Sequence, residues 1–334
     1  MLLEVPQKVK IQKYISKEFK GNKFSISEIK GDASNRKYYR AISKKRKLII
    51  MDSSLEKRNY NNFLKFTKIF ENKKIRVPEI FYKNLDKKIL VMEDLGNNLI
   101  YDKVNKNNFF EIYEKAIINI IDIQKIKDKS INRYTREKYF KESFLFLEWV
   151  LKSFFKLKIS NKDNRKLKKS LDFLVNNINY EHNKLVHRDY HSKNLFYKSK
   201  KVIIIDYQDA LYGSPLYDFV SIINDCYRDI DKTSKNLLLN LFLSTYNDVH
   251  IKKFSNDEFF HNYHLLTTQR HLKASGIFCR LSVKYNRHNY LKHLSRTLNY
   301  IVNASYGYGN LDIVNYYAQE VINILNESNY SSRR

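Results

Sequence analysis

One stretch of this chain, residues 185–209, constrains its fold and chemistry more than any other. It contains the pattern His-Arg-Asp-x-x-x-x-Asn, in which Asp189 supplies the acid and Asn194 the amide. The apolar, β-branched run that comes next ends at Asp206, and this pattern predicts a short buried strand with a carboxylate at its end. A tight loop and a neighbouring strand therefore present two carboxylates and one amide.

Transfer of a phosphoryl group from ATP requires the groups that this stretch carries. A carboxylate accepts the proton of the attacking hydroxyl, and an amide oxygen with a second carboxylate holds Mg²⁺ against the phosphates. Asp189 suits the first role, and Asn194 and Asp206 suit the second. The pattern is that of protein-kinase catalytic loops, so it indicates an enzyme that uses ATP and Mg²⁺. A chance charged loop is the alternative, which the joint spacing of the three residues disfavours.

The length and composition allow two lobes, each with its own core, because the chain has 334 residues. No run of 18 or more apolar residues occurs, so we expect no membrane span. The first residues lack the apolar segment of a secretion signal. Cys226 and Cys279 lie far apart and form no metal or redox motif, which favours free thiols in a reducing compartment. We expect a cytoplasmic protein and a monomer.

The net charge of +27 could indicate nucleic acid, an acidic membrane surface or an anionic substrate as partner. The basic residues are, however, spread along the whole chain. Lys, Asn, Ile and Tyr are all abundant, whereas the chain has 7 Gly and 3 Pro, a bias that an AT-rich coding sequence imposes whatever the function. Compositional bias therefore explains the charge better than a nucleic-acid footprint, and we expect no nucleic-acid partner.

Hydrophobic periodicity divides the chain into a strand-rich first part and a helical second part. With the catalytic-loop pattern, this order predicts an α+β, protein-kinase-like fold of two lobes. We place a small, mainly antiparallel β lobe with a helix at 1–95 and a large helical lobe at 96–334. The predicted strands are 24–29, 36–42, 47–52, 79–82 and 88–93. The predicted helices are 9–19, 55–70, 109–126, 135–157, 164–177, 217–227, 235–247, 256–284, 290–304 and 312–327.

The strand–turn–strand unit at 24–42 stands where a kinase-type fold covers the phosphates with a hairpin. Small residues in its turn, Ser34 among them, would let backbone N–H groups approach the phosphates, although the G-x-G-x-x-G pattern is absent. The third strand ends at Asp52 without the lysine that pairs the phosphates in protein kinases. Arg36 and Arg40 are the best replacements, because a guanidinium can hold a phosphate through two hydrogen bonds. An ordinary turn and a solvated strand face are the alternatives.

The strand at 88–93 is followed by Asp-Leu-Gly. This combination indicates a hinge between the two lobes. We expect the backbone between Glu93 and Leu95 to hydrogen-bond the adenine edge of ATP; a simple strand-end turn is the alternative.

Taken together, these motifs resemble the aminoglycoside phosphotransferase superfamily of kinase-like small-molecule kinases, and most of all its anomeric N-acetylmuramate/N-acetylglucosamine kinases of cell-wall recycling. The likeness spans nearly the whole chain, and the HRDYHSKN and DYQDALYG segments are its most specific parts. The GDAS turn and the QRHLK segment separate this branch from the antibiotic kinases. The segments that carry the likeness are 31–40, 51–52, 92–96, 187–194, 206–213, 217–218 and 269–278.

The resemblance implies an enzyme that phosphorylates the anomeric (C1) hydroxyl of N-acetylmuramate, N-acetylglucosamine or both in peptidoglycan recycling. A hemiacetal hydroxyl is more acidic than an ordinary alcohol, so Asp189 need only be a modest base. The resemblance also implies that Gln269, Arg270 and Lys273 contact the sugar, and one of these cations could meet the carboxylate of N-acetylmuramate. A solvated or interlobe helix face is the alternative for these residues. Glu142 could reach sugar hydroxyls, although a surface position is the simpler assignment.

Two other functions remain open. One is a kinase of another small alcohol, such as an aminoglycoside, choline or a nucleoside. A cationic aminoglycoside would need an acidic site, whereas the C-terminal helices carry mostly bases. The other is a non-catalytic, kinase-shaped protein that binds nucleic acid, which the missing strand lysine favours. The joint presence of Asp189, Asn194 and Asp206 opposes it.

Overall fold

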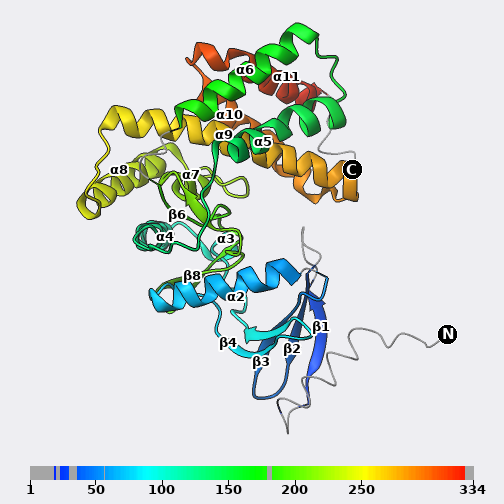
Figure 1. Cartoon of the computed structure of the whole chain (residues 1–334), viewed down its shortest axis with the longest axis vertical. Coiled ribbons are helices and arrows are strands. Elements are labelled where there is room, and N and C mark those ends of the chain that lie inside the picture. The colour runs from blue at the N-terminus through cyan, green and yellow to red at the C-terminus, as the bar shows by residue number, and fades with distance from the viewer. Residues whose placement is uncertain (1–18, 20–22, 30–35, 56, 179–182, 328–334) are drawn as a thin grey trace, which may run out of the picture. The chain divides into compact units, whose positions relative to one another are not determined.

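The structure, a computed structural model, describes residues 19, 23–29, 36–55, 57–178 and 183–327 (Figure 1). It divides into two compact units: unit 1 is Met1–Asn98 with Ile203–Gln208, and unit 2 is Leu99–Val202 with Asp209–Arg334. The predicted α+β, kinase-like fold class is confirmed, because unit 1 is built on an antiparallel sheet and unit 2 is mostly helical. The lobe boundary after residue 95 stays a prediction. The helix predicted at 9–19 lies outside the described residues except for its last position.

Unit 1 is built on one sheet of five strands, β1 (Ser25–Ile29), β2 (Lys37–Ile42), β3 (Lys47–Asp52), β4 (Ile80–Asn84) and β5 (Ile89–Glu93). The strand order is β1-β2-β3-β5-β4, and all neighbours are antiparallel. Alternation explains the sheet: in β2, Tyr39 and Ala41 are buried while the residues between and beside them are more exposed. The core on that face consists of Phe24, Ile26, Tyr39, Ala41, Leu48, Ile50, Ile89 and Val91.

Helix α2 (Lys57–Asn72) anchors the segment of unit 1 that contains Asp206. Phe63 and Thr67 are buried one turn apart on the same helix face. The ring of Tyr207 stacks on Phe63 at a centroid distance of 5.0 Å, and its hydroxyl is hydrogen-bonded to Thr67 Oγ1 at 2.7 Å. The Tyr207 side chain, which follows Asp206 in the chain, is therefore fixed by its packing against α2.

Unit 2 contains most of the helices and two small sheets. In one sheet β6 (Lys184–Val186) pairs with β9 (Leu211–Gly213); the other is the hairpin of β7 (Leu195–Lys198) and β8 (Lys201–Ile204), and the division between the units falls inside β8. The sequence predicts only β8, which carries an apolar, β-branched run; β6 and β9 have three residues each, and β7, although as long as β8, has no such run. The remaining elements are α3 (Ile100–Lys103), α4 (Phe109–Gln124), α5 (Arg136–Leu145), η1 (Phe146–Phe154), α6 (Asn161–Asn177), α7 (Tyr217–Ile223), α8 (Lys232–Val249), α9 (Asn256–Tyr285), η2 (His288–His293), α10 (Leu294–Ser305), η3 (Gly309–Leu311) and α11 (Asp312–Glu327).

Three predicted helices differ from the structure, and one of them, predicted at 290–304, begins within the 3-10 helix η2 and continues as α10. The helix predicted at 135–157 consists of α5, capped by the Thr135 side chain, and a π-helix, η1, which hydrophobic periodicity does not distinguish from an α-helix. The helix predicted at 217–227 ends at Ile223. The expected last turn is not helical, and its Asp225 carboxylate accepts the backbone amides of Ser192 and Tyr227.

Gly276 lets the long helix α9 approach the end of α5. A Cβ atom at this position would lie 2.5 Å from Leu145 Cβ and 2.6 Å from its carbonyl carbon. We expect Gly276→Ala to lower the free energy of unfolding by about 1–3 kcal/mol, because backbone atoms must shift to make room. Urea unfolding followed by circular dichroism measures the loss. Gly309→Ala is the matched control, since the nearest atom to its added Cβ is 3.9 Å away; equal losses in the two variants would contradict the packing argument.

Within the described residues, none of the helices combines the length and apolarity that a membrane crossing requires.

Candidate active site

Two buried aspartates hold the backbone of the loop that carries Asp189. Asp218, in the first turn of α7, accepts the amides of the two residues before Asp189, at 2.6 and 2.9 Å. Asp225, just after α7, accepts the amide of Ser192 at 2.9 Å. Both aspartates are 0% exposed, so these bonds replace the water that the carboxylates and amides would otherwise bind. The loop is therefore attached to α7 on both sides of Asp189.

Arg188 has a left-handed backbone, with φ of +78°, which is unusual for a residue with a side chain. Its buried guanidinium donates to Glu142 Oε1 at 2.5 Å and to the Asp209 carbonyl at 3.2 Å. It also lies over the ring of Tyr134, 4.8 Å from the centroid, while the Tyr134 hydroxyl donates to the other oxygen of Glu142. These contacts hold the strained backbone in place and fix the direction of Asp189, the next residue.

The Asp189 side chain is 40% exposed, and its Oδ1 lies 3.5 Å from Lys273 Nζ. Lys273 is only 10% exposed and also lies 3.7 Å from Glu142 Oε2. Burial alone would raise the pKa of Asp189, but the charges of Lys273 and Arg188 outweigh it and hold the pKa well below its ordinary value. At Lys273, where burial would lower the pKa, the neighbouring carboxylates raise it. Asp189 is therefore ionised at neutral pH, which is the state that a general base needs.

Asn194 is held against the same loop. Its Nδ2 donates to the Asp189 carbonyl at 3.0 Å and lies 3.4 Å from His191 Nε2. Burial lowers the pKa of His191 to about 4, so this ring is neutral at pH 7. Because both contacts of Asn194 use the amide nitrogen, its Oδ1 takes no hydrogen bond from the described residues and can serve as a ligand.

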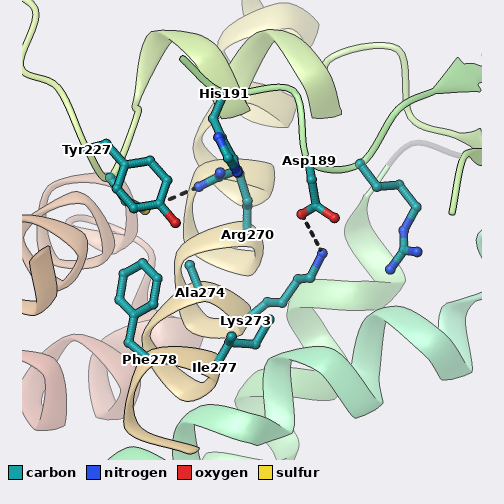
Figure 2. A pocket seen from close by; sticks show the side chains of 10 residues that line it. Asp189, His191, Tyr227, Arg270, Lys273, Ala274, Ile277 and Phe278 are labelled. Atoms are coloured by element: carbon teal, nitrogen blue, oxygen red, sulfur yellow. Dashed lines mark hydrogen bonds and ion pairs between the residues drawn. The ribbon is translucent and has the colours of Figure 1, made fainter. Parts of the chain in front are cut away.

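Asp189 opens onto a small pocket of unit 2 with a cavity volume of about 100 Å³. Figure 2 shows the Lys273 ammonium directed at Asp189, with the rings of Tyr227 and Phe278 on the other side of the pocket. The pocket therefore has a charged end beside the candidate base and an apolar wall opposite. It is lined by Arg188, Asp189, His191, Cys226, Tyr227, Arg270, Lys273, Ala274, Ile277 and Phe278.

In unit 1, Asp206 is a second acid with a left-handed backbone, with φ of +62°. Its Oδ1 accepts hydrogen bonds from Arg36 Nη2 and from Gln208 Nε2, both at 3.0 Å. The Arg36 side chain is 5% exposed, whereas that of Asp206 is 41% exposed. The structure thus brings together Arg36, which the sequence assigns to phosphate binding, and Asp206, which it assigns to metal binding.

The donor atoms fit Mg²⁺ bound to a nucleotide better than a metal site made by protein alone. Mg²⁺ takes oxygen ligands and is usually held by one or two protein groups together with phosphates and water. Asn194 offers an amide oxygen, and the half-exposed carboxylate of Asp206 makes both of its protein contacts through Oδ1. In the described part of the chain, no group of three or more His, Cys, Asp and Glu side chains is arranged to hold a metal.

Arg40 forms a two-point ion pair with Asp94, at 2.8 Å from Nε to Oδ2 and 3.1 Å from Nη2 to Oδ1. Asp94 is buried and also accepts the amide of Gly96 at 2.8 Å. Gly96 has φ of +66°, a conformation that glycine adopts without strain. Arg40 therefore ties the turn after β5 to β2, and a phosphate would have to compete with Asp94 for it. Its phosphate-binding role stays a prediction.

The predicted adenine-binding backbone falls in the same turn. The Glu93 amide donates to the Glu79 carbonyl at 2.8 Å, and the Glu93 side chain pairs with Arg76. Because that amide is used inside the sheet, the amide of Leu95 is the better donor for adenine, and this contact stays a prediction. Ser34 lies outside the described residues.

The three predicted substrate residues of α9 are placed differently. Arg270 and Lys273 line the pocket. Gln269 is 0% exposed and lies behind the lining, where its Nε2 donates to the Tyr139 carbonyl at 3.3 Å. The substrate contacts of all three stay predictions.

Sequence reasoning missed the importance of Glu142, for which it favoured a surface position. The structure places Glu142 between Arg188 and Lys273, with a side chain that is 15% exposed. A signal was present, because Glu142 lies three residues after Tyr139, which is fully buried, and so shares its helix face. Asp225 had no such signal, since nothing in its local sequence indicates a contact with the catalytic loop.

Comparisons with known proteins find relatives that match this chain over most of its length. The chain is 25% identical to an N-acetylmuramate/N-acetylglucosamine kinase of Neisseria meningitidis serogroup B, over 91% of this chain and 93% of the relative. It is 27% identical to a protein of the same name from Pseudomonas aeruginosa, over 82% of this chain and 81% of the relative.

Solved structures share the fold at low sequence identity. Aminoglycoside phosphotransferase APH(2'')-Ib, bound to ADP, has a TM-score of 0.60 and 13% identity, with 89% of this chain and 98% of that chain covered. Choline kinase LicA from Streptococcus pneumoniae has a TM-score of 0.58 and 12% identity, with 86% and 98% covered. The model of the phosphotransferase enzyme family matches residues 25–243, more than half of the sequence, and the chain belongs to this family.

Proposed function

We propose that this chain transfers the terminal phosphoryl group of ATP to the anomeric hydroxyl of N-acetylmuramate, N-acetylglucosamine or both. The observation that carries the proposal is the ionised, half-exposed carboxylate of Asp189 at the edge of a small-molecule pocket. Relatives at 25–27% identity are named for these two sugars, and similar structures were solved with ADP or AMP. We place the reaction in the cytoplasm, where ATP is available, as a step of peptidoglycan recycling.

On the sugar side, Asp189 accepts the proton of the C1 hydroxyl as the oxygen attacks phosphorus. General-base catalysis of this kind contributes a factor of about 10²–10⁴. Lys273 keeps Asp189 ionised, because its ammonium lies 3.5 Å from the carboxylate oxygen. Arg188 and Glu142 hold this pair in a fixed geometry, which is needed because catalysis depends on the orientation of the base.

On the nucleotide side, we assign the Mg²⁺ contacts to Asn194 Oδ1 and Asp206, which are oxygen donors of the preferred kind. Bound Mg²⁺ would neutralise charge on the phosphates. We assign the phosphate contact of the missing lysine to Arg36, which Asp206 already holds in place at 3.0 Å. The Leu95 amide is the proposed adenine donor.

The charges of the pocket favour an amino sugar over a cationic alcohol. Arg188, Arg270 and Lys273 line it with Asp189, and Glu142 lies within ion-pair distance of Arg188 and Lys273, so three cations stand against two carboxylates. An aminoglycoside or choline carries positive charge and would be disfavoured by this small excess of cations. An N-acetylated amino sugar is neutral at nitrogen, and N-acetylmuramate is an anion.

A panel assay tests the substrate class. Purified protein is mixed with ATP, Mg²⁺ and either N-acetylmuramate, N-acetylglucosamine, choline, kanamycin or a nucleoside, and ADP release is followed with a coupled assay. We expect ADP release with one or both N-acetylated sugars and background rates with the others. Turnover of choline or kanamycin alone would replace the proposed substrate and leave the phosphotransferase family intact.

Replacing Lys273 by methionine should change the pH dependence of kcat/KM. In the wild type the pKa of Asp189 lies well below its ordinary value, so Asp189 stays ionised as the pH falls to 5. Without the ammonium, burial raises the pKa of Asp189, so the base becomes protonated at a higher pH. The pH at which kcat/KM falls on the acid side of the profile should therefore rise by about one pH unit or more. Lys273→Arg keeps the positive charge, so kcat/KM should fall at the same low pH as in the wild type. Superimposable profiles for Lys273→Met and wild type would contradict the assigned role.

A further inference from the structure

The pocket contains a buried cation that lacks an ionic partner. Arg270 lies on α9, is 5% exposed and lines the pocket. Its Nε donates to Ser221 Oγ at 2.6 Å, and its Nη1 lies 3.4 Å from Cys226 Sγ and 3.5 Å from His271 Nε2. None of these contacts uses Nη2, and none is to a carboxylate. Among the described residues, Arg270 forms no ion pair.

The other cations of the pocket are paired. Lys273 lies between Asp189 and Glu142, and Arg188 pairs with Glu142. Burial lowers the pKa of Arg270, and the charge of Asp225 is among the influences that raise it. The two oxygens of Asp225, however, accept the amides of Ser192 and Tyr227. Among the described residues, Arg270 is thus the lining cation that makes no direct contact with a carboxylate.

The side chains that contact Arg270 directly include no carboxylate. Burial and the charge of Arg270 lower the pKa of His271 to about 3, so this ring is neutral. The hydroxyl of Ser221 is neutral as well. A buried guanidinium without a carboxylate is costly, because it has lost water and gained no opposite charge. Such a group is best explained by an anion that arrives from outside.

We infer that Arg270 recognises the carboxylate of the substrate, so that the pocket selects an acidic N-acylated amino sugar over its neutral counterpart. This inference rests on the proposed function and deepens it. A guanidinium presents a planar pair of N–H donors that matches a carboxylate, which makes arginine the suited residue for this contact. N-acetylmuramate carries such a group on its lactyl ether, whereas N-acetylglucosamine has only a hydroxyl there.

The rest of the pocket suits the same molecule. Asp189 and Arg270 both line it, so the reacting hydroxyl and the carboxylate can be held in one cavity. Figure 2 shows Arg270 and Lys273 on the same helix, with Lys273 directed at Asp189 and Arg270 directed toward the side where Tyr227 lies. Ala274, Ile277 and Phe278 supply apolar surface for the methyl groups of an acetyl and a lactyl substituent.

The experiment compares two sugars in three proteins: wild type, Arg270→Gln and Arg270→Lys. We expect the wild type to prefer N-acetylmuramate, and Arg270→Gln to lower kcat/KM for N-acetylmuramate about 10- to 100-fold but for N-acetylglucosamine by less than about 3-fold. Arg270→Lys should recover part of the preference. The ratio of the two values does not depend on the folded fraction of a variant. Arg296→Gln, at a cation that pairs with Asp229 and lies outside the pocket lining, is the matched control and should leave the ratio unchanged.

An equal loss of kcat/KM for both sugars in Arg270→Gln would overturn the inference. A parallel rise in the KM for ATP would also overturn it, because Arg270 would then be a phosphate ligand. If a variant does not fold, the substrate can be changed in place of the protein. Calorimetry should show that the wild type binds the carboxamide of N-acetylmuramate at least 10-fold more weakly than the acid. Tighter binding of N-acetylmuramate than of its carboxamide, without turnover of either sugar, would support the inference and contradict the proposed reaction. Equal binding of acid and carboxamide would overturn the inference while leaving a sugar kinase in place.

Discussion

Replacing Asp189 by asparagine is expected to lower kcat by a factor of about 10²–10⁴ and to leave ATP binding unchanged. The amide keeps the size of the side chain but cannot accept the proton of the C1 hydroxyl. ADP release measures the rate, and titration with a fluorescent nucleotide measures binding. Asp172→Asn, at an exposed aspartate of α6, is the control and should retain wild-type activity.

Two outcomes would contradict this assignment. Activity of Asp189→Asn within about tenfold of the wild type would mean that another group takes the proton. Loss of ATP binding together with activity would indicate a structural role for Asp189 instead. A non-catalytic protein that binds nucleic acid would show neither effect, and its affinity for RNA or DNA would be the same in both proteins.

Asp218→Ala is expected to lower the free energy of unfolding by about 2–5 kcal/mol, because it leaves two buried amides, those of His187 and Arg188, without an acceptor. The same change should abolish most activity, since the left-handed Arg188 loses one of the contacts that hold it. Urea unfolding measures the loss of stability. Asp231→Ala is the matched control: Asp231 caps the exposed start of α8, and removing it should cost only about 1 kcal/mol.

A loss for Asp218→Ala no greater than that for Asp231→Ala would show that the loop backbone does not depend on this carboxylate. Retained kcat in a destabilised Asp218→Ala protein would separate stability from catalysis and would assign the loop geometry to Asp225 and Glu142 instead.

Much of this account follows from local sequence patterns. The spacing of Asp189, Asn194 and Asp206 predicts the three polar groups, and apolar patterns, alternating at 24–29 and continuous at 47–52, predict strands of unit 1, because both are properties of short segments. The absence of the strand lysine is also visible in the sequence. The pairing of Arg36 with Asp206 is not, since the two residues are far apart in the chain and meet only when unit 1 folds.

What could not be predicted depends on contacts across long stretches of chain. Tyr139, three residues earlier, signals that Glu142 lies on a buried helix face, but nothing in the local sequence identifies Arg188 as its partner, which it meets only in the folded chain. The unwinding after Ile223 depends likewise on the distant amide of Ser192. The unpaired state of Arg270 is a property of the folded pocket, because a sequence does not show which cations lack a carboxylate.

The central claim is that the Asp189 pocket phosphorylates a sugar at its anomeric oxygen. Phosphorus NMR of a reaction with ATP, Mg²⁺ and both N-acetylated sugars tests this most directly. We expect a new phosphomonoester signal that correlates with the anomeric proton on C1 in a proton–phosphorus spectrum, and no such signal with Asp189→Asn. A signal that correlates with the protons on C3, C4 or C6, or no sugar phosphate at all from the wild-type protein, would contradict it.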